Sequence, residues 1–232
     1  MEISSWRHAF KLDPAKTISD ESLERVCESG TDGIIIGGTD DITLEGVLDL
    51  LMRVRRFTVP VALEISSMDA ISPGFDYYFI PTVLNSSSTK WMKDLHVSAI
   101  KEFGHMIQWH EMIMEGYCIL NPSCKAAIAT EADTSLTEEE VIAHAVLAEK
   151  VFRLPVFYME YSGMYGDPVL VNKVKRNLDT TQLFYGGGID GPDKAAEMAA
   201  IADTIIVGNS IYDQFEEALK TVAAVKNSHA TY

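Results

Sequence analysis

The fold is decided by two stretches of sequence, Asp32-Gly33-Ile34-Ile35-Ile36-Gly37-Gly38 and Thr204-Ile205-Ile206-Val207-Gly208-Asn209. Each is continuously apolar for several residues and then reaches glycine, instead of alternating apolar with polar residues. A strand that is apolar on both sides must be covered on both sides, which is typical of a parallel sheet enclosed by helices. The two stretches therefore predict buried parallel strands.

Six further short apolar runs raise the number of expected strands to eight. The expected strands cover residues 8–13, 32–38, 59–66, 77–84, 116–121, 155–162, 182–188 and 204–209. Helix signals stand between them: Thr43 precedes an apolar helix face, Thr137 opens a capping box, and Pro192 suits a first helical turn. The last helix is expected to begin near Ser210 and to run through Leu219.

This alternation predicts the α/β class and a single (β/α)₈ TIM-barrel domain over residues 1–232, with an open doubly wound sheet as the alternative. One connection departs from an ideal barrel. Between the third and fourth expected strands only residues 67–76 are available, and Pro73 and Gly74 there resist helix formation. We expect the third outer helix to be missing or replaced by an extended segment. Its absence leaves an apolar flank that serves as an interface or as a binding groove.

The composition excludes several classes of protein. Of 232 residues, 47% are hydrophobic, and 34 acidic against 19 basic side chains give a net charge of −15. The apolar content argues against disorder, and the negative charge argues against nucleic-acid binding. No run reaches the ~18 apolar residues of a membrane span, and the first residues lack the features of a signal peptide. Three cysteines without a Cys-x-x-Cys pair predict reduced thiols and no zinc site. We therefore expect a cytoplasmic protein.

Glycine-rich turns follow the seventh and eighth expected strands. The seventh ends in Tyr185-Gly186-Gly187-Gly188 and the eighth in Val207-Gly208-Asn209-Ser210. Glycine lets backbone N–H groups approach an anion closely, and barrels often bind phosphate after these two strands. Each turn taken alone also suits a purely structural role, but the two together predict a phosphate site.

The first two expected strands end in charged and hydroxyl side chains. Lys11 and Asp13 share one face by the period of two and are expected to point into the barrel mouth. Lysine suits phosphate, and aspartate suits Mg²⁺, which takes its remaining ligands from water and phosphate oxygens. The alternative is a Lys11–Asp13 ion pair. Thr39 is a candidate second metal ligand, whereas Asp40 and Asp41 also suit the capping of the next helix.

The sixth expected strand contains the candidate catalytic group. Tyr158, Glu160 and Ser162 lie on one face, and a carboxylate in a barrel mouth is costly to bury unless it has a partner or a task. Few basic residues lie near the strand ends, so the duty of a general base is favoured over a structural ion pair. His105 and His110 fit a helix packed against the barrel better than a metal site.

Several of these segments together resemble the geranylgeranylglyceryl/heptaprenylglyceryl phosphate synthase family, most closely its bacterial branch. The segments are residues 10–14 (FKLDP), 30–40 (GTDGIIIGGTD), 157–163 (FYMEYSG), 184–189 (FYGGGI) and 207–209 (VGN). The similarity runs from about Trp6 to Lys226. It implies a modified TIM barrel without its third helix that transfers a prenyl chain from prenyl diphosphate to the 3-hydroxyl of sn-glycerol 1-phosphate. It also implies Mg²⁺ as cofactor, diphosphate as the second product, and a homodimer.

Residue roles follow from the resemblance. The residues implied to bind glycerol 1-phosphate are Lys11, Tyr158, Met159, Glu160, Tyr161, Ser162, Gly163, Gly188, Gly208 and Asn209. Asp13 and Thr39 are implied to hold Mg²⁺. In the helix expected to begin near Trp91, the small residues Ser98 and Ala99 are expected to border the groove and to leave room for a heptaprenyl tail. Because the net charge opposes adhesion to anionic lipid, membrane contact is expected to be transient and to use the apolar flank.

Two other classes of function stay open from the residues alone. A phosphosugar isomerase or aldolase on the same barrel requires a pair of acids or a Schiff-base lysine, and the fifth expected strand ends in Asn121 rather than in an acid. A protein that only binds prenyl lipid needs no chemistry at all. Release of diphosphate in the presence of both substrates and Mg²⁺ distinguishes these classes.

Overall fold

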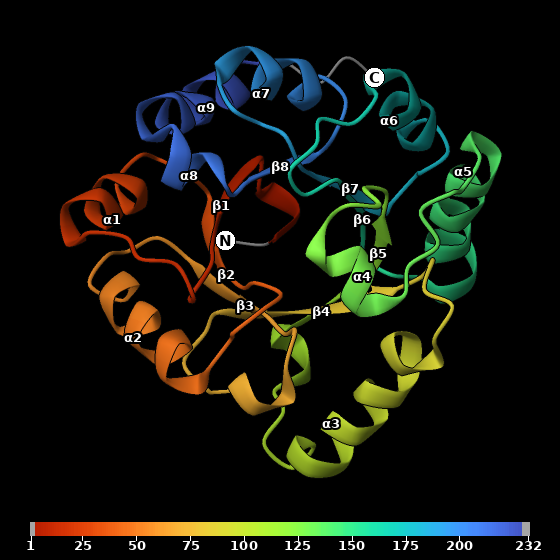
Figure 1. Cartoon of the computed structure of the whole chain (residues 1–232), viewed down its shortest axis with the longest axis horizontal. Coiled ribbons are helices and arrows are strands. Elements are labelled where there is room, and N and C mark those ends of the chain that lie inside the picture. The colour runs from red at the N-terminus through yellow and green to blue at the C-terminus, as the bar shows by residue number, and fades with distance from the viewer. Residues whose placement is uncertain (1–2, 229–232) are drawn as a thin grey trace.

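The computed structural model describes residues 3–228 and contains a closed barrel of eight parallel strands (Figure 1). The strands follow each other around the barrel in chain order, and β1 pairs with both β2 and β8. This confirms the TIM barrel and excludes the open sheet. The strands are β1 (His8–Leu12), β2 (Gly33–Ile36), β3 (Val61–Glu64), β4 (Tyr77–Val83), β5 (Met112–Ile119), β6 (Val156–Glu160), β7 (Gln182–Gly186) and β8 (Thr204–Val207).

Most of the helices surround the barrel on its outside, whereas the short helix of residues 125–130 lies in front of the strands (Figure 1). The helices are α1 (Asp20–Cys27), α2 (Leu44–Val54), α3 (Leu95–Phe103), α4 (Lys125–Thr130), α5 (Glu138–Val146), α6 (Pro168–Lys175), α7 (Pro192–Ala199), α8 (Ser210–Asp213) and α9 (Phe215–Asn227). The caps predicted from the sequence are present. Thr43 accepts a hydrogen bond from the backbone N–H of Gly46, and Thr137 and Glu140 form both bonds of a capping box. None of the described helices is long and apolar enough to span a bilayer.

Strand side chains point alternately into the barrel and out to the helices, as period-2 geometry requires. The inward layer is apolar in the middle of the barrel, where Ile35, Phe79 and Phe184 belong to one buried cluster. The outward layer packs under the helices and includes Ile34 and Ile36. Both faces of each strand are therefore buried, which explains the continuous apolar runs.

Strand limits differ from the prediction in a regular way. Every strand ends one or two residues earlier than expected, because the last residues of each run form the loops at the barrel mouth. Strand β5 begins at Met112 rather than at residue 116. The acidic Glu115 interrupts the apolar pattern there, but the structure buries this side chain inside the barrel.

The prediction of one continuous helix from about Ser210 through Leu219 was wrong, because the structure has two helices there. Gln214 has a non-helical backbone (φ −143°, ψ 58°) and separates α8 from α9. The segment containing His105 and His110 also differs from the prediction. It forms a loop and a 3₁₀ turn (Trp109–Glu111), with Met106 and Trp109 mostly exposed, instead of a helix packed on the barrel.

The connection between β3 and β4 lacks a full helix, as predicted. Its regular structure is a single 3₁₀ turn, Met68–Ala70. The next connection begins with a π-helical turn, Lys90–Asp94, that continues into α3. Helix α3 has no fully buried side chain and stands away from the strands in Figure 1. The barrel is therefore thinly covered on this side, next to its mouth.

Candidate active site at the carboxyl ends of the strands

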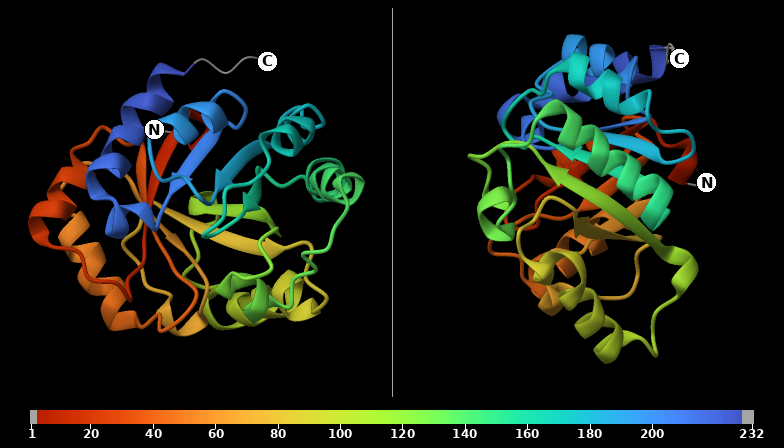
Figure 2. Two further views of the ribbon diagram at one scale, coloured as in Figure 1. Left: turned by 45° about the horizontal axis from the view of Figure 1, so that its top comes forward. Right: turned by 90° about the vertical axis from the view of Figure 1, so that its right-hand side faces the viewer.

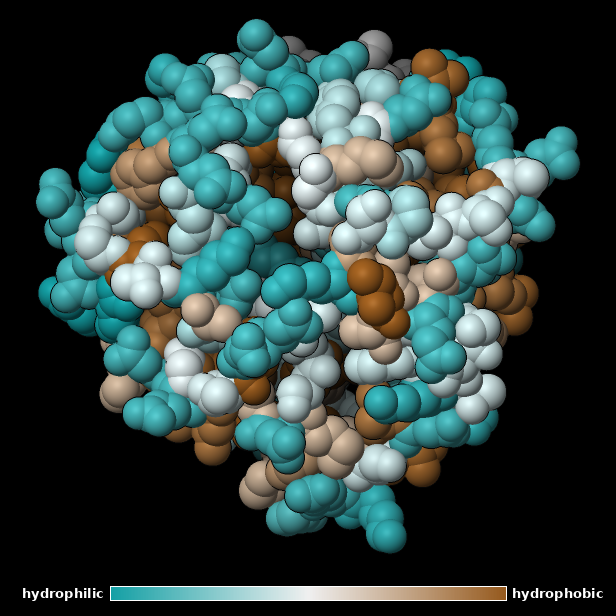
Figure 3. Space-filling model, viewed as in Figure 1, coloured by the Kyte–Doolittle hydropathy of each residue, from teal (hydrophilic) through white to brown (hydrophobic). Residues whose placement is uncertain are grey.

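A cavity of about 920 Å³ opens at the carboxyl ends of the strands. The right-hand view of Figure 2 shows the strands pointing towards the side on which α4 lies, and Figure 3 shows this side hollowed near its middle. Loops after all eight strands contribute to its wall. This is the end of a TIM barrel at which active sites form.

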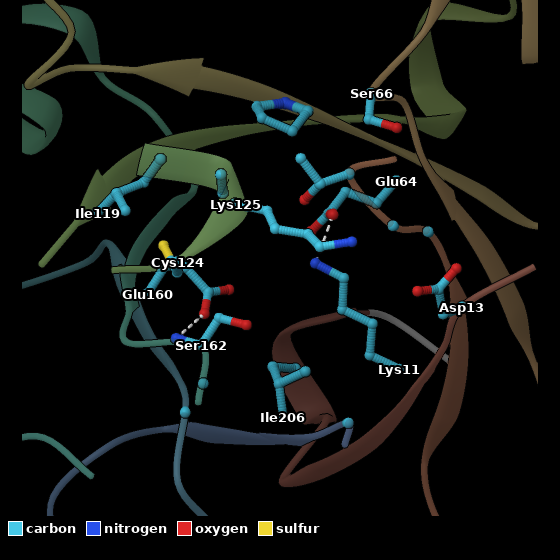
Figure 4. A pocket seen from close by; sticks show the side chains of 18 of the residues that line it. Lys11, Asp13, Glu64, Ser66, Ile119, Cys124, Lys125, Glu160, Ser162 and Ile206 are labelled. Atoms are coloured by element: carbon cyan, nitrogen blue, oxygen red, sulfur yellow. Dashed lines mark hydrogen bonds and ion pairs between the residues drawn. The ribbon is translucent and has the colours of Figure 1, made fainter. Parts of the chain in front are cut away.

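An ion pair between two strands lies in the cavity. The Nζ of Lys11 on β1 is 2.5 Å from Oε2 of Glu64 on β3 (Figure 4). Burial lowers the pKa of Lys11, but the charges of Glu64 and Glu160 outweigh it, so the pKa of the ammonium is raised. Lys11 therefore pairs with Glu64 rather than with Asp13, and it stays charged.

The carboxylate of Glu160 is held at the end of β6, close to Lys11. Its Oε2 accepts a hydrogen bond of 2.8 Å from the Tyr117 hydroxyl, and its Oε1 accepts one of 2.5 Å from the backbone N–H of Ser162 (Figure 4). Burial raises the pKa of Glu160, although the Lys11 charge and the Tyr117 hydrogen bond oppose this shift. A glutamate that faces a cavity and has a raised pKa is a stronger base than an exposed one, and this suits it to accept a proton from a bound ligand.

Two acidic groups of this cluster were missed by the sequence analysis. Glu64 ends β3, and Glu115 lies deeper in the barrel on β5, where neither carboxylate oxygen has a hydrogen-bond partner among the described residues. Burial, with the charge of Glu64 second, raises the pKa of Glu115 well above its ordinary value. The alternation of Glu115 and Tyr117 with apolar neighbours was a signal of inward-facing positions on β5.

The predicted phosphate turns surround one side of the cavity. Gly188 has φ 63°, in the left-handed region that favours glycine, and a Cβ there would be 2.3 Å from the backbone nitrogen of Tyr165. Gly208 and Asn209 follow β8 and line the same cavity. The hydroxyl of Ser210 is buried and has no hydrogen-bond partner among the described residues. Backbone amides at glycines beside a free hydroxyl form a suitable environment for a phosphate.

The structure separates the sixth-strand residues into two groups. Tyr158, Glu160, Ser162 and Gly163 line the cavity. The side chains of Met159 and Tyr161 instead point outward and belong to the cluster under the helices. Their side chains therefore do not reach a ligand in the cavity. Of these two residues, only the backbone is in a position to bind glycerol 1-phosphate as the sequence predicted.

The two predicted metal ligands lie together at the cavity wall. The Oδ1 of Asp13 accepts a hydrogen bond from the backbone N–H of Ala15, and a Cβ on Gly38 would be 2.7 Å from that oxygen. The loop that carries Thr39 is thus packed directly on the Asp13 carboxylate, and both residues line the cavity. One carboxylate and one hydroxyl fit Mg²⁺, which completes its shell with water and substrate phosphate. The described residues contain no cluster of three or more His, Cys, Asp or Glu that suits a metal held by protein alone.

Asp40 and Asp41, which follow Thr39, do not cap the next helix. Thr43 caps α2, so neither Asp40 nor Asp41 serves as that cap. Asp40 instead pairs with Lys125 across the cavity mouth, at 2.7 Å between Oδ2 and Nζ. Sequence reasoning did not identify Lys125, because its partner follows a different strand.

The other half of the cavity is an apolar groove. Trp91, Leu95 and Ala99 come from the segment leading into α3 and from α3 itself, and Ala126 and Ala129 come from α4. Ser98, predicted to border the groove with Ala99, is exposed and does not line the cavity. His96 adds a ring whose Nε2 is 3.3 Å from the Thr82 hydroxyl.

The sequence and the fold match known proteins over almost their whole length. A heptaprenylglyceryl phosphate synthase of Anoxybacillus flavithermus is 62% identical over 229 residues, 99% of this chain and 99% of the relative. One of Lysinibacillus sphaericus is 61% identical, over 98% of this chain and 100% of the relative. The crystal structure of (S)-3-O-geranylgeranylglyceryl phosphate synthase from Thermoplasma acidophilum, in complex with its substrate sn-glycerol-1-phosphate, has a TM-score of 0.84 at 25% identity. That likeness covers 96% of this chain and 94% of the other. The PcrB family model matches residues 1–226, and the chain therefore belongs to the PcrB family.

Proposed function

We propose that this protein is a prenyltransferase that moves a heptaprenyl chain from prenyl diphosphate to the 3-hydroxyl of sn-glycerol 1-phosphate. The names of relatives above 60% identity and the glycerol-1-phosphate complex of the Thermoplasma enzyme support this assignment. The observation that carries it is one cavity that joins a glycine-lined anion site, a buried carboxylate and an apolar groove. An amphiphilic donor and a small phosphorylated acceptor need these three features side by side.

The acceptor binds on the glycine-rich side of the cavity. Its phosphate lies against the backbone of Gly188 and Gly208, with Asn209 beside them, and its hydroxyls point towards Glu160. Backbone N–H groups at these turns are fixed before the ligand arrives, so little ordering entropy is lost on binding. Fixing the acceptor beside the donor turns two reactants into one oriented pair.

The reaction exchanges one carbon–oxygen bond for another. The bond between the allylic carbon and diphosphate breaks, the diphosphate leaves with the electron pair, and the 3-hydroxyl oxygen of the acceptor bonds to that carbon. Glu160 takes the hydroxyl proton, and its negative charge favours the developing cation on carbon. The raised pKa of Glu160 supports this role, because it makes the carboxylate a stronger base than an exposed glutamate.

Magnesium is part of this proposal. Asp13 and Thr39 supply the oxygen ligands from the protein, and the bound ion would act as a Lewis acid on the departing diphosphate. The packing of Gly38 against the Asp13 carboxylate supports a fixed position for both ligands.

The setting of the reaction is proposed from charge and shape. We place the protein in the cytoplasm as a homodimer, in keeping with the family resemblance. With a net charge of −15, the chain is repelled by anionic lipid, so contact with a membrane is transient. The donor tail enters through the apolar groove between α3 and α4.

The structure speaks against an aldolase of the Schiff-base type. Such an enzyme needs a neutral amine, whereas the pKa of Lys11, an inward-facing lysine of the barrel, is raised by Glu64 and Glu160. A protein that merely binds prenyl lipid remains the competing function to test.

Mass analysis of the reaction product tests the assignment. The purified protein is incubated with Mg²⁺, sn-glycerol 1-phosphate and an equimolar mixture of prenyl diphosphates of different length, and diphosphate release is measured in parallel. We expect heptaprenylglyceryl phosphate as the main product, with one diphosphate released for each ether formed. Omission of the acceptor and use of sn-glycerol 3-phosphate are the controls. Retention of the donor without release of diphosphate would identify a binding protein instead.

A further inference from the structure

Lys125 connects two opposite parts of the cavity wall. It is the first residue of α4, after β5, and its ammonium pairs with Asp40 in the loop after β2. Figure 4 shows its side chain extending into the middle of the cavity, towards the side on which Lys11, Glu64 and Asp13 lie. Its side chain is 72% exposed, so a ligand in the cavity can reach it.

The other lysines of the cavity wall are already engaged elsewhere. Lys11 is paired with Glu64 at the base of the cavity. Lys16 donates a hydrogen bond of 3.0 Å to Asn209, and Lys194 pairs with Asp190, so both lie on the side of the glycine turns. Among the described residues that line the cavity, Lys125 is the one cation on the side of the apolar groove.

Acidic groups surround Lys125. The hydrogen bond and the charge of Asp40 raise its pKa, and the charges of Asp41 and Asp13 add to this. The candidate metal ligand Asp13 is thus within electrostatic range of the ammonium. Three carboxylates at one edge of the cavity repel a diphosphate, unless cations there offset their charge.

The same helix also forms a wall of the groove. Ala126 and Ala129 follow Lys125 on α4 and line the apolar half of the cavity. Lys125 therefore stands where the apolar half meets the polar half. A prenyl diphosphate bound with its tail in the groove must place its diphosphate at this junction, because the two phosphates are attached to the first carbon of the tail.

We propose that Lys125 is a binding residue for the diphosphate of the prenyl donor, and that its ammonium exchanges Asp40 for diphosphate oxygens when the donor enters; this inference rests on the proposed prenyl transfer. Before the donor binds, Asp40 keeps the ammonium over the cavity. When the carbon–oxygen bond breaks, the electron pair stays with the diphosphate, and Lys125 donates hydrogen bonds to the charge that develops there. No proton needs to move from Lys125 for this step to balance.

The test compares Lys125→Met with Lys125→Arg and with Lys173→Met. Lys173 is an exposed lysine of α6 whose Nζ is 2.7 Å from Oε2 of Glu138, outside the cavity. Its replacement therefore removes the same charge from the protein without touching the proposed donor site. Inorganic pyrophosphate with Mg²⁺ serves as the probe in calorimetric binding, which needs no turnover. The KM values for prenyl diphosphate and for glycerol 1-phosphate are measured on the same proteins.

For Lys125→Met we expect pyrophosphate affinity to fall at least about tenfold, since a hydrogen bond between charged groups is lost. The KM for prenyl diphosphate should rise by a similar factor, while the KM for glycerol 1-phosphate changes less than about twofold if only the donor site is affected. Lys125→Arg should keep most of the affinity, and Lys173→Met all of it.

Two results would overturn the inference. If a folded Lys125→Met protein binds pyrophosphate as tightly as the parent protein does, Lys125 does not belong to the donor site. The proposed prenyl transfer would still stand in that case, because it is supported by the activity of the parent protein. An equal loss in Lys173→Met shows a general effect of net charge instead of a specific contact. A parent protein that releases no diphosphate from prenyl diphosphate contradicts the proposed function itself, and this inference with it.

Discussion

The orientation and the pKa of Glu160, the proposed general base, are both set by its place in the barrel. Its two oxygens accept hydrogen bonds from Tyr117 and from the backbone of Ser162, so its orientation is fixed before any ligand binds. Its position at the end of β6 removes it from bulk water, and burial raises its pKa. Positioning and proton affinity are thus both set by the strand end on which it lies.

Replacing Glu160 by Gln should remove the base while preserving the shape of the side chain. We expect kcat to fall by roughly 10²–10⁴-fold, the usual contribution of a general base. In the parent protein, kcat should decline on acidification already above pH 4.5, the ordinary pKa of glutamate, because the raised pKa leaves the carboxyl protonated there. The measurement is a pH–rate profile with thermal unfolding as a folding control. A loss below tenfold, with chemistry shown to limit the rate, contradicts the assignment.

Asp13→Asn tests the proposed magnesium site. A neutral amide binds Mg²⁺ poorly, so we expect turnover to need much more Mg²⁺ or to disappear, while the fold persists. A titration of the rate with Mg²⁺ measures this. Asp193→Asn is a matched control, since Asp193 lies exposed in the first turn of α7 and outside the cavity. The same Mg²⁺ dependence in Asp13→Asn and in the parent protein would refute the role of Asp13.

At the scale of elements, the missing helix after β3 and the loosely packed α3 belong together. A short connection with one 3₁₀ turn leaves the flank of β3 and β4 thinly covered, and α3 buries no side chain completely. No helix covers this flank; Ala70 and Phe75 of the connection are buried against the core instead, while Met68 and Ile71 line the cavity together with Leu95 and Ala99. In the proposed function, this side of the cavity receives the apolar tail of the donor.

The length of the bound chain is expected to depend on Ala99. Its side chain faces the groove, whereas the neighbouring Ser98 is exposed. We predict that Ala99→Trp keeps activity with a four-isoprene donor and loses it selectively with a seven-isoprene donor, because the ring occupies the path of the longer tail. Ser98→Trp is the matched control and should affect neither donor. Equal effects on both donors in a folded Ala99→Trp protein would show that Ala99 only allows close packing.

At the scale of the whole molecule, the far end of the barrel is closed by buried contacts. Trp6 is 1% exposed and packs edge-on against Phe79, and a Cβ on Gly33 would be 2.2 Å from its ring. His8 on β1 is fully buried, with one ring nitrogen 2.9 Å from the hydroxyl of Thr31 and the other 2.9 Å from that of Thr221 on α9. His8 thus ties the first strand to the last helix.

This contact predicts that acid destabilises the fold through His8. Burial lowers the pKa of His8 from 6.5 to about 3, although Asp32 opposes the shift. Between these values the unfolded chain binds a proton that the folded chain does not, so stability falls as pH falls. The effect is at most about 1.4 kcal/mol per pH unit, or about 2 kcal/mol between pH 6.5 and pH 5.

Urea unfolding of the parent protein and of His8→Gln at pH 7.5 and pH 5 measures this effect. The variant should be less stable at pH 7.5, because glutamine cannot reproduce both ring contacts. Its free energy of unfolding should nevertheless change less between the two pH values. An identical pH dependence in both proteins would show that other groups cause the acid sensitivity.

Much of the architecture was predictable from sequence because it depends on local pattern. Continuous apolar runs such as Ile34–Ile36 require cover on both faces, and their number and spacing indicated eight strands. Thr137 with Glu140 predicted a helix start, because a capping box involves only neighbouring backbone groups. The short segment 67–76 predicted the missing helix by length alone. The period of two along a strand likewise predicted that Lys11 and Glu160 lie in the mouth of the barrel.

The sequence by itself therefore determined the class of fold, the strand that carries the candidate base, and the glycine turns, whereas only the tertiary structure decided which side chains meet. Glu64, Glu115 and Lys125 were not identified, because each contacts or faces groups on strands or loops far away in the chain. Such partners depend on the stagger and closure of all eight strands together, which no local pattern encodes. The outward direction of Met159 and Tyr161, by contrast, follows from the alternation of side chains along β6, which also points Tyr158 and Glu160 inward. The tertiary structure also set the pKa shifts of the buried groups, since proton affinity depends on the surroundings that the closed barrel creates.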